Sequence, residues 1–114
     1  MKKSERRSVC PVACTLDVVG DKWTLLVIRD LMFGRSHFKE FLQSPEGIAT
    51  NILSNRLTRL LEHEIIETYA SEMHPGRDAY RLTRKGKSLG KIVRAVADWG
   101  LANLKGTEAR MTMK

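Results

Sequence analysis

Only two cysteines occur in the sequence, Cys10 and Cys14, and they lie close together. Small secreted domains that depend on disulfides carry an even set of cysteines spread along the chain. The histidines, His37, His63 and His74, share no ligand spacing with each other or with the cysteines, and no zinc motif is present. We therefore expect a reduced compartment, no metal ion and no cofactor.

Long apolar segments are also missing. The most apolar run, residues 23–33, is far shorter than the ~20 residues that cross a bilayer, and it contains Arg29 and Asp30. The basic N-terminus is not followed by a long apolar stretch before Asp17, so no secretory signal is expected. The sequence predicts a cytoplasmic protein with no membrane partner.

Patterns typical of catalysis are missing too. Glu62 beside His63, or Glu40 near His37, would be the candidate acid and base. No nucleophile motif, glycine-rich phosphate loop or pair of carboxylates accompanies them. We therefore expect that the protein is not an enzyme.

The charge of the chain is strongly basic. Among 114 residues, 20 are Lys or Arg and 13 are Asp or Glu, which leaves a net charge of +7. This length suits one domain, and a basic surface attracts polyanions such as nucleic acid. We expect a single domain over residues 9–107, with a flexible basic tail over residues 1–8 and a second flexible tail over residues 108–114.

The first part of the chain is predicted to form three helices. A short helix over residues 11–19 ends at Gly20. Asp21 caps a second helix that runs through Phe33, and its almost wholly apolar sequence makes it a central helix. Ser36 caps a third, short helix, HFKEFLQ.

The segment 47–66, GIATNILSNRLTRLLEHEII, has an unusual polar face. Apolar residues recur at helical spacing as Leu53, Leu57 and Leu60, and they predict a buried stripe. The residues expected on the opposite face are Asn51, Asn55, Thr58 and Glu62. Amides and hydroxyls hold a helix less well than Lys or Glu, so this face is predicted to bind something other than water.

The last part of the chain predicts a hairpin and a helix. The strand-like runs TYA and AYRL flank a Pro-Gly turn, which favours a β-hairpin. Thr83 is expected to cap one long final helix. The apolar stripe of that helix consists of Leu89, Ile92, Val93, Val96 and Trp99, with Leu104 at its end. The stripe exceeds what a helix at the edge of a small domain needs, so a partner surface is expected.

This order of elements is that of a winged helix-turn-helix, a mainly α fold with a small β-hairpin and helical dimerisation elements at both termini. Such proteins place the second helix of the motif in the major groove, where Asn can pair with adenine and Arg can read guanine or clasp phosphate. Double-stranded DNA is therefore the predicted partner. The candidate DNA-binding residues on this helix are Thr50, Asn51, Ser54, Asn55, Arg56, Thr58 and Arg59. For Arg56, a structural ion pair is equally open.

Further candidate contacts lie beyond this helix. His74 and Arg77 sit at the expected hairpin tip, where they can reach a minor groove or a phosphate. Six basic residues and no acid occur between residues 81 and 94. Of these, Arg81 and Lys85 are the expected phosphate contacts.

Several separated motifs also resemble those of the HxlR-type transcriptional regulators, a bacterial winged-helix family. They are CP near the start, LDVVGDKWTLLVIRDLMFG, GI with LSNRLTRLLE, and YRLTRKG with the late Trp99. The resemblance implies a homodimer that binds operator DNA, with terminal helices packed between subunits. It also implies that Cys10 is a candidate thiol sensor. The alternative is that Cys10 and Cys14 are small apolar residues of the dimer core.

Three residues depart from that family's usual pattern. Ala49 replaces a Ser or Thr helix cap, so the cap must shift to Thr50 or be lost. His37 replaces an Arg before the third helix. Glu64 stands where Gly is usual, so it must either adopt the left-handed conformation or end the helix differently.

Other function classes remain open from the sequence. A winged helix can be a protein-interaction module without sequence-specific DNA binding, which an apolar or acidic outward face of helix 47–63 would favour. A structural subunit that binds anions without sequence preference is the third class.

Overall fold

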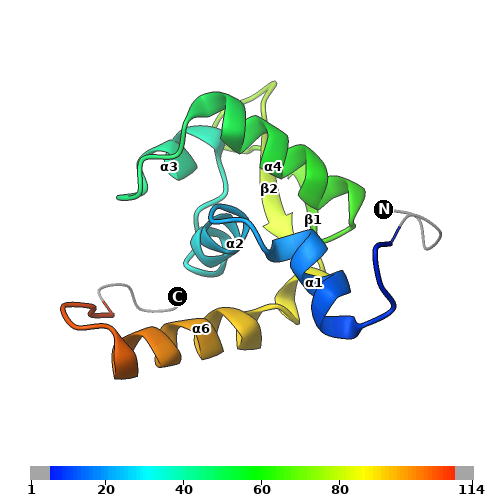
Figure 1. Ribbon diagram of the computed structural model, residues 1–114. Helices are drawn as coiled ribbons and strands as arrows, with labels where there is room; N and C mark the ends of the chain where they lie inside the picture. Colours follow the sequence, from blue (N-terminus) through cyan, green and yellow to red (C-terminus); the bar gives the residue numbers. More distant parts are fainter. Residues whose placement is uncertain (1–5, 110–114) are drawn as a thin grey trace.

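The computed structural model of the protein describes residues 6–109. The elements, in chain order, are α1 (Pro11–Val19), α2 (Thr24–Met32), α3 (Phe38–Leu42), α4 (Thr50–Glu62), β1 (Ile66–Ala70), β2 (Asp78–Leu82), α5 (Arg84–Lys87) and α6 (Gly90–Asn103). Figure 1 shows α4 along one side of the domain and α6 along the other, with α2 between them. Of the two expected flexible tails, residues 1–5 and 110–114 lie outside the described residues.

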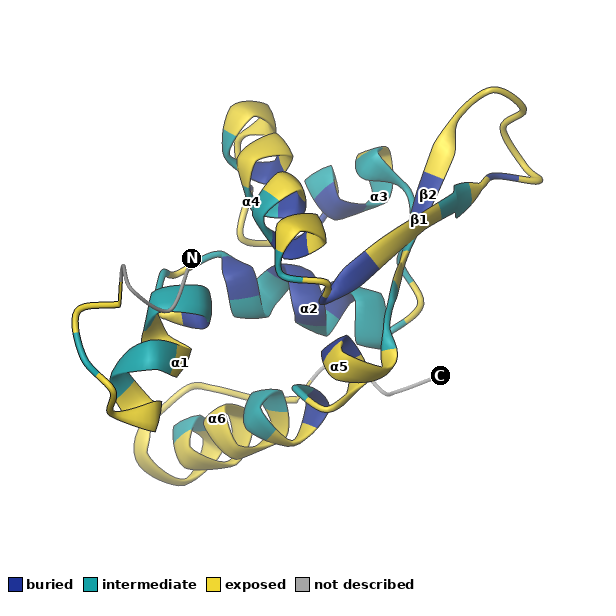
Figure 2. Cartoon of the chain, turned by 90° about the vertical axis from the view of Figure 1, so that its right-hand side faces the viewer, coloured by how far each residue is buried: buried dark blue, intermediate teal, exposed yellow. Residues whose placement is uncertain are grey.

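The core gathers around α2, as the apolar sequence of that helix predicts. Val27 and Ile28 from α2 are buried together with Phe41 from α3, and α4 adds its leucine stripe. Figure 2 shows the buried positions concentrated on α2, on the inner side of α4 and at the start of β1. The central position of α2 fixes where α4 can lie.

The turn between α1 and α2 follows the predicted pattern. A Cβ on Gly20 would stand 2.3 Å from the carbonyl oxygen of Leu16, so only glycine fits there. The Asp21 carboxylate accepts hydrogen bonds from the backbone N–H groups of Trp23 and Thr24, at 2.8 and 2.9 Å. Asp21 therefore caps the helical turn that leads into α2, although the α-helix proper begins at Thr24 and ends one residue before Phe33.

The cap of α3 is His37 and not Ser36, so that expectation is wrong. The Glu40 carboxylate reaches back and accepts from the N–H groups of Ser36 and His37, at 3.0 and 2.9 Å. This contact satisfies two N–H groups at once and moves the helix start one residue later than a Ser36 cap would.

The predicted hairpin is present, and its strands are longer than the two apolar runs indicate. Strands β1 and β2 pair antiparallel, with Ile66 opposite Leu82 and Ala70 opposite Asp78. The N–H of Tyr80 also donates to the carbonyl oxygen of Ser36, at 2.8 Å. This bond ties β2 to the segment that precedes α3.

The prediction of one long final helix is also wrong, because the chain forms two helices there, α5 and α6. Thr83 caps only the four-residue α5, where its hydroxyl accepts from the N–H of Gly86 at 3.1 Å. A Cβ on Gly86 would stand 2.0 Å from the carbonyl oxygen of Ile65, so α5 is pressed against the start of β1. Glycine also weakens a continuous helix, and α6 starts afresh at Gly90, which packs on Met32.

Glu64 adopts the left-handed conformation, with φ of +58°, and is the only non-glycine residue with positive φ among residues 6–109. The first of the two outcomes expected for this position is therefore the one observed. A side chain in this region carries a steric cost that glycine avoids.

We expect Glu64→Gly to raise the free energy of unfolding by about 0.5–1 kcal/mol, because relief of that steric cost exceeds the entropy that glycine adds to the unfolded chain. Glu62→Gly is the matched control, since it places glycine at a helical position and should lower stability by a similar amount. Urea unfolding midpoints measure the stability of both variants. A shift of both midpoints in the same direction would contradict the steric cost that we assign to Glu64.

Candidate nucleic-acid interface

Helix α4 carries an exposed polar face along its whole length. Leu53, Leu57 and Leu60 are buried, as their spacing predicts. The exposed residues of the opposite side are Asn51, Ser54, Asn55, Thr58 and Glu62. Figure 2 shows this outer side of α4 as an exposed strip facing away from α2. The face can donate and accept hydrogen bonds without disturbing the core.

The N-terminus of α4 lacks a side-chain cap. The N-cap residue is Ala49, in an extended conformation with φ −71° and ψ 147°, and it makes no capping hydrogen bond. The cap is therefore lost and not shifted to Thr50, which is the first residue of the helix. Uncapped N–H groups at a helix start suit a phosphate oxygen.

Two arginines of α4 are turned toward the α1–α2 turn. Arg56 Nε lies 3.1 Å from Asp21 Oδ1, and Arg59 Nη1 lies 3.9 Å from Asp21 Oδ2. Arg59 also donates to the backbone carbonyl of Asp17 at 3.2 Å. Arg56 thus makes the structural ion pair that the sequence left open, and it also donates to Asn55 Oδ1 at 2.5 Å.

Asp21 is charged in this arrangement. Burial alone would raise the pKa of Asp21, but hydrogen bonds from Thr24, Trp23 and Arg56 outweigh burial and hold that pKa well below its usual range. The carboxylate therefore serves as a permanent anchor for α4 on the start of α2.

The hairpin loop, residues 71–77, is tied to the start of α3. Ser71 Oγ lies 2.7 Å from His37 Nε2 and accepts from the N–H of His74 at 3.0 Å. The rings of His37 and His74 stand edge to face, with centroids 5.3 Å apart. His37 therefore connects the loop to the start of α3, at the position where HxlR-type regulators usually have Arg.

A groove of about 640 Å³ separates α3 from this loop. Lys39 contributes to its α3 side, and His74 and Arg77 contribute to its loop side. Glu40 and Asp78 also line the groove, so its charge is mixed, and Lys39 and Arg77 are the cationic groups in it that can contact a phosphate. Sequence reasoning did not select Lys39, because nothing in the sequence places α3 opposite the hairpin tip.

Arg81 and Lys85, the two phosphate contacts expected from the sequence, do not line this groove. Arg81 Nε lies 2.7 Å from Glu67 Oε2, and its guanidinium lies 5.0 Å from the centre of the Tyr69 ring. Lys85 Nζ donates to the carbonyl oxygen of His63 at 2.8 Å, at the C-terminal end of α4. Both side chains thus have partners within the domain.

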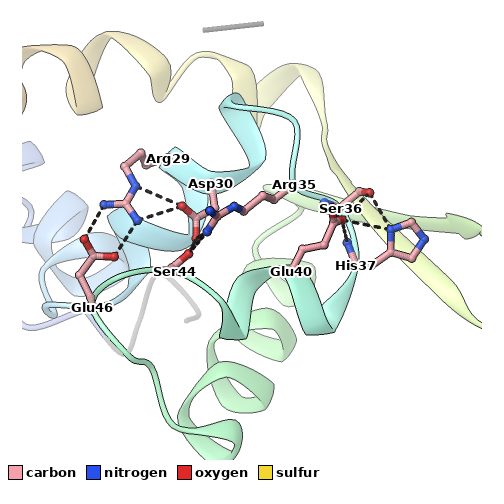
Figure 3. A network of polar contacts seen from close by, with 8 residues as sticks. All are labelled: Arg29, Asp30, Arg35, Ser36, His37, Glu40, Ser44 and Glu46. Carbon is pink, nitrogen blue, oxygen red and sulfur yellow. Dashed lines mark hydrogen bonds and ion pairs between the residues drawn. The ribbon is translucent and has the colours of Figure 1, made fainter. Parts of the chain in front are cut away.

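The turn that precedes α4 is held by a polar cluster around the buried Asp30 (Figure 3). Asp30 is only 3% exposed and lies 2.9 Å from Arg29 Nη2. Arg29 also pairs with Glu46 at 2.8 Å, and Ser44 bridges Asp30 to Arg35. The hydrogen bond to Glu46, followed by the contacts with Asp30, raises the pKa of Arg29. These contacts fasten the α3–α4 turn to α2.

The second group of contacts drawn in Figure 3 surrounds Glu40 at the start of α3. Burial would raise the pKa of Glu40, but bonds from the N–H groups of Ser36 and His37 and from their side chains lower it to about 2. A charged Glu40 thus caps α3 and orients His37 toward the hairpin loop.

Within residues 6–109, no group of three or more His, Cys, Asp or Glu side chains is placed to hold a metal ion. The same part of the chain contains no helix long and apolar enough to cross a membrane.

A buried scaffold helix, a two-helix motif with an exposed second helix, and a hairpin docked beside it together define a winged helix-turn-helix protein. The HxlR-like helix-turn-helix family matches residues 18–108. The chain belongs to this family of transcriptional regulators.

Individual relatives agree with that assignment. The HTH-type transcriptional regulator YdeP of Bacillus subtilis (strain 168) is 31% identical over 91 residues, covering 80% of this chain and 71% of YdeP. The crystal structure of PA1607 superposes with a TM-score of 0.84 at 36% identity, covering 97% of this chain and 79% of PA1607. The redox regulator HypR, in its oxidized form, superposes with a TM-score of 0.74 at 32% identity, covering 82% of this chain and 97% of HypR.

Proposed function

We propose that the protein is a sequence-specific regulator of transcription that binds double-stranded operator DNA in the cytoplasm as a homodimer, and that it is not an enzyme. The observation that carries this proposal is the exposed amide and hydroxyl face of α4 above a fully buried leucine stripe. A major groove admits one α-helix and offers a different donor and acceptor pattern for each base pair.

The candidate residues divide by the contact they can make. Asn51, Ser54 and Asn55 are exposed on α4 and suit base edges, and Asn55 keeps its amide N–H donors for a base because only its Oδ1 accepts from Arg56 at 2.5 Å. The Thr58 hydroxyl, by contrast, already donates to the carbonyl of Ser54 at 3.0 Å. Thr50 at the uncapped helix start, and His74 and Arg77 in the loop, suit phosphates. Arg56, Arg59, Arg81 and Lys85 are supporting contacts, because each already bonds to a group of this chain.

We expect Asn55→Ala to weaken operator binding by about 1–3 kcal/mol and random-duplex binding little, because an amide that reads a base matters only at the right sequence. Arg77→Ala should weaken both and lower the salt slope by about one, because it removes one phosphate contact. Fluorescence anisotropy over a salt series on a selected operator and a random duplex measures both effects.

An equal loss on the two duplexes for Asn55→Ala would contradict base reading by α4. A wild-type protein with no preference between the duplexes at any salt concentration would instead favour a protein-interaction module or a subunit that binds anions non-specifically.

Exposed apolar residues on α1 and α6 support the homodimer. Those on and beside α1 are Val9, Val12 and Leu16, and those on and after α6 are Val96, Trp99, Leu101 and Leu104. Trp99 is 62% exposed in the single chain, which is unusual for so large an apolar side chain. Patches of this kind mark interfaces, and we assign them to a second copy of the chain.

Sedimentation at micromolar concentration should show a dimer, and Trp99→Asp should dissociate it because a carboxylate would be buried without a partner. Met73→Asp is the matched control, since Met73 is 77% exposed in the hairpin loop, away from both helices, and should leave the dimer intact. In the wild type, the recognition helices should address half-sites about 34 Å, or a multiple, apart. A monomeric wild type that binds single half-sites would contradict the assignment.

Cys10 supports redox regulation within this proposal. Its side chain is exposed at the N-cap of α1, whereas Cys14 is half-buried and donates its S–H to the carbonyl of Ser8 at 3.2 Å. Cys14 lies one helical turn after Cys10, where a bridge within an intact helix is strained. A disulfide between the Cys10 residues of two subunits avoids that strain, and the similar structure of HypR is that of a redox regulator.

Treatment with diamide should link two Cys10 thiols, which lose two protons and two electrons while diamide is reduced to its hydrazine. We expect operator affinity to change after this treatment in the wild type and in Cys14→Ser, and to stay constant in Cys10→Ser. Non-reducing electrophoresis and operator titration measure the link and its effect. An equal response from Cys10→Ser would leave Cys10 a structural residue.

A further inference from the structure

The permanent charges that line the groove between α3 and the hairpin loop cancel. Lys39 and Arg77 bring two positive charges to the lining. Glu40 and Asp78 bring two negative charges. Burial opposes ionisation of Glu40, but the hydrogen bonds that it accepts at the start of α3 lower its pKa to about 2. With these permanent charges alone, the groove therefore offers a phosphate no net attraction.

Two histidines decide the sign of the charge in the groove. His37 and His74 are the other titratable residues among the described lining residues. Histidine is the side chain that ordinarily gains a proton between pH 8 and pH 5. Glu72 is also exposed in the hairpin loop, but it is not part of the lining. One proton on the histidine pair therefore makes the lining of the groove positive.

The surroundings of His37 can accept a protonated ring. Its Nδ1 lies 3.2 Å from Glu40 Oε1, and its Nε2 lies 2.7 Å from Ser71 Oγ. Each ring nitrogen thus has an acceptor when both nitrogens carry hydrogen. Ser71 is 7% exposed and also accepts from the N–H of His74 at 3.0 Å. Protonation of His37 therefore needs only a rotation of the Ser71 hydroxyl, with no movement of heavier atoms.

The two histidine rings titrate as one coupled unit. Their centroids are 5.3 Å apart, so a proton on one ring disfavours a second proton on the other. His37 is half-buried against α3, whereas His74 is exposed in the loop. The pair therefore takes up its first proton more readily than its second.

The groove lies where DNA bound to α4 would pass. Figures 1 and 2 both show the hairpin loop projecting on the side of the domain that carries α4, away from α6. A duplex seated on the exposed face of α4 therefore has phosphates on the same side of the domain as the loop. A phosphate in the groove favours the protonated form of the histidine pair, because opposite charges attract.

We propose that the groove is a proton-linked phosphate site, in which a DNA phosphate binds between Arg77 and Lys39 while the His37–His74 pair takes up one proton from the solvent. The inference rests on the proposed DNA binding and gives it a regulation. Because binding takes up a proton, affinity rises as the pH falls through the histidine range. The rise ends where the pair is already protonated in the free protein.

The test measures binding of the full-length protein to a random-sequence duplex, because a phosphate contact does not depend on base sequence. Fluorescence anisotropy is recorded at about 0.15 M salt, from about pH 7.5 to about pH 6. Binding should be at least about fivefold tighter at the lower pH. Calorimetry in two buffers with different heats of ionisation should show an uptake of up to about one proton per subunit.

Two variants locate the proton. The double variant His37→Gln, His74→Gln should lose the pH dependence and the proton uptake, because glutamine keeps hydrogen-bonding groups but does not titrate. His74→Arg should bind at about pH 7.5 as tightly as the wild type binds at about pH 6, because its charge is permanent. His74 is exposed, so this variant tests the proposal even if the double variant does not fold.

His63→Gln is the matched control. His63 is the C-cap of α4 and lies outside the groove. Burial, assisted by Lys85 and Arg59, lowers the pKa of His63 and so favours its neutral form. This variant should keep the pH dependence of the wild type.

A wild type whose duplex affinity does not change with pH would overturn the proton-linked site and leave the proposed function standing. Loss of the pH dependence in His63→Gln, or unchanged affinity in His74→Arg at about pH 7.5, would also overturn the site. Absence of binding to any duplex at any pH would overturn the site and the proposed function together. PH-dependent binding without preference for an operator would support the site and count against sequence-specific reading alone.

Discussion

The buried carboxylate of Asp30 is the constraint on which the position of α4 depends. It is 3% exposed, and its partners come from α2 itself and from the segments on both sides of α3. A buried charge that loses a partner costs several kcal/mol, so the Arg29, Arg35 and Ser44 contacts must form together. The α3–α4 turn is thereby fixed on α2, and α4 presents its polar face at one defined angle.

The hairpin takes its position from the same region of the chain. Ser36 accepts from the N–H of Tyr80 at 2.8 Å, and His37 contacts Ser71 at 2.7 Å. Helix α3 is thus the common reference for α4 and for the hairpin loop. The helix face and the loop, which together form the candidate interface, therefore keep a fixed spacing.

The features that depend on periodicity were predicted correctly from the sequence. The predictions failed where contacts with other residues determine the helix ends and the side-chain partners. The Leu53, Leu57 and Leu60 spacing correctly predicted the buried side of α4, and the Pro-Gly turn predicted the hairpin. Glu40, reaching back from the third position of the first turn, decides that His37 and not Ser36 caps α3. The break between α5 and α6 depends on Gly86 meeting the carbonyl of Ile65. The partners that Arg56 and Arg59 share across the domain, Asp17 and Asp21, lie in α1 and in the α1–α2 turn, which no local pattern places beside α4.

Helix α6 is attached to the domain through its first turn, so a small tilt there is amplified along the helix. It has 14 residues, and only its beginning is seated on the domain, where Gly90 meets Met32 and Leu89 and Val93 pack on the core. A helix of this length extends about 21 Å, so a tilt of about 10° at Gly90 displaces its far end by about 4 Å. The absence of a side chain at Gly90 therefore sets where the far end of α6, which carries the exposed Trp99, lies relative to the domain.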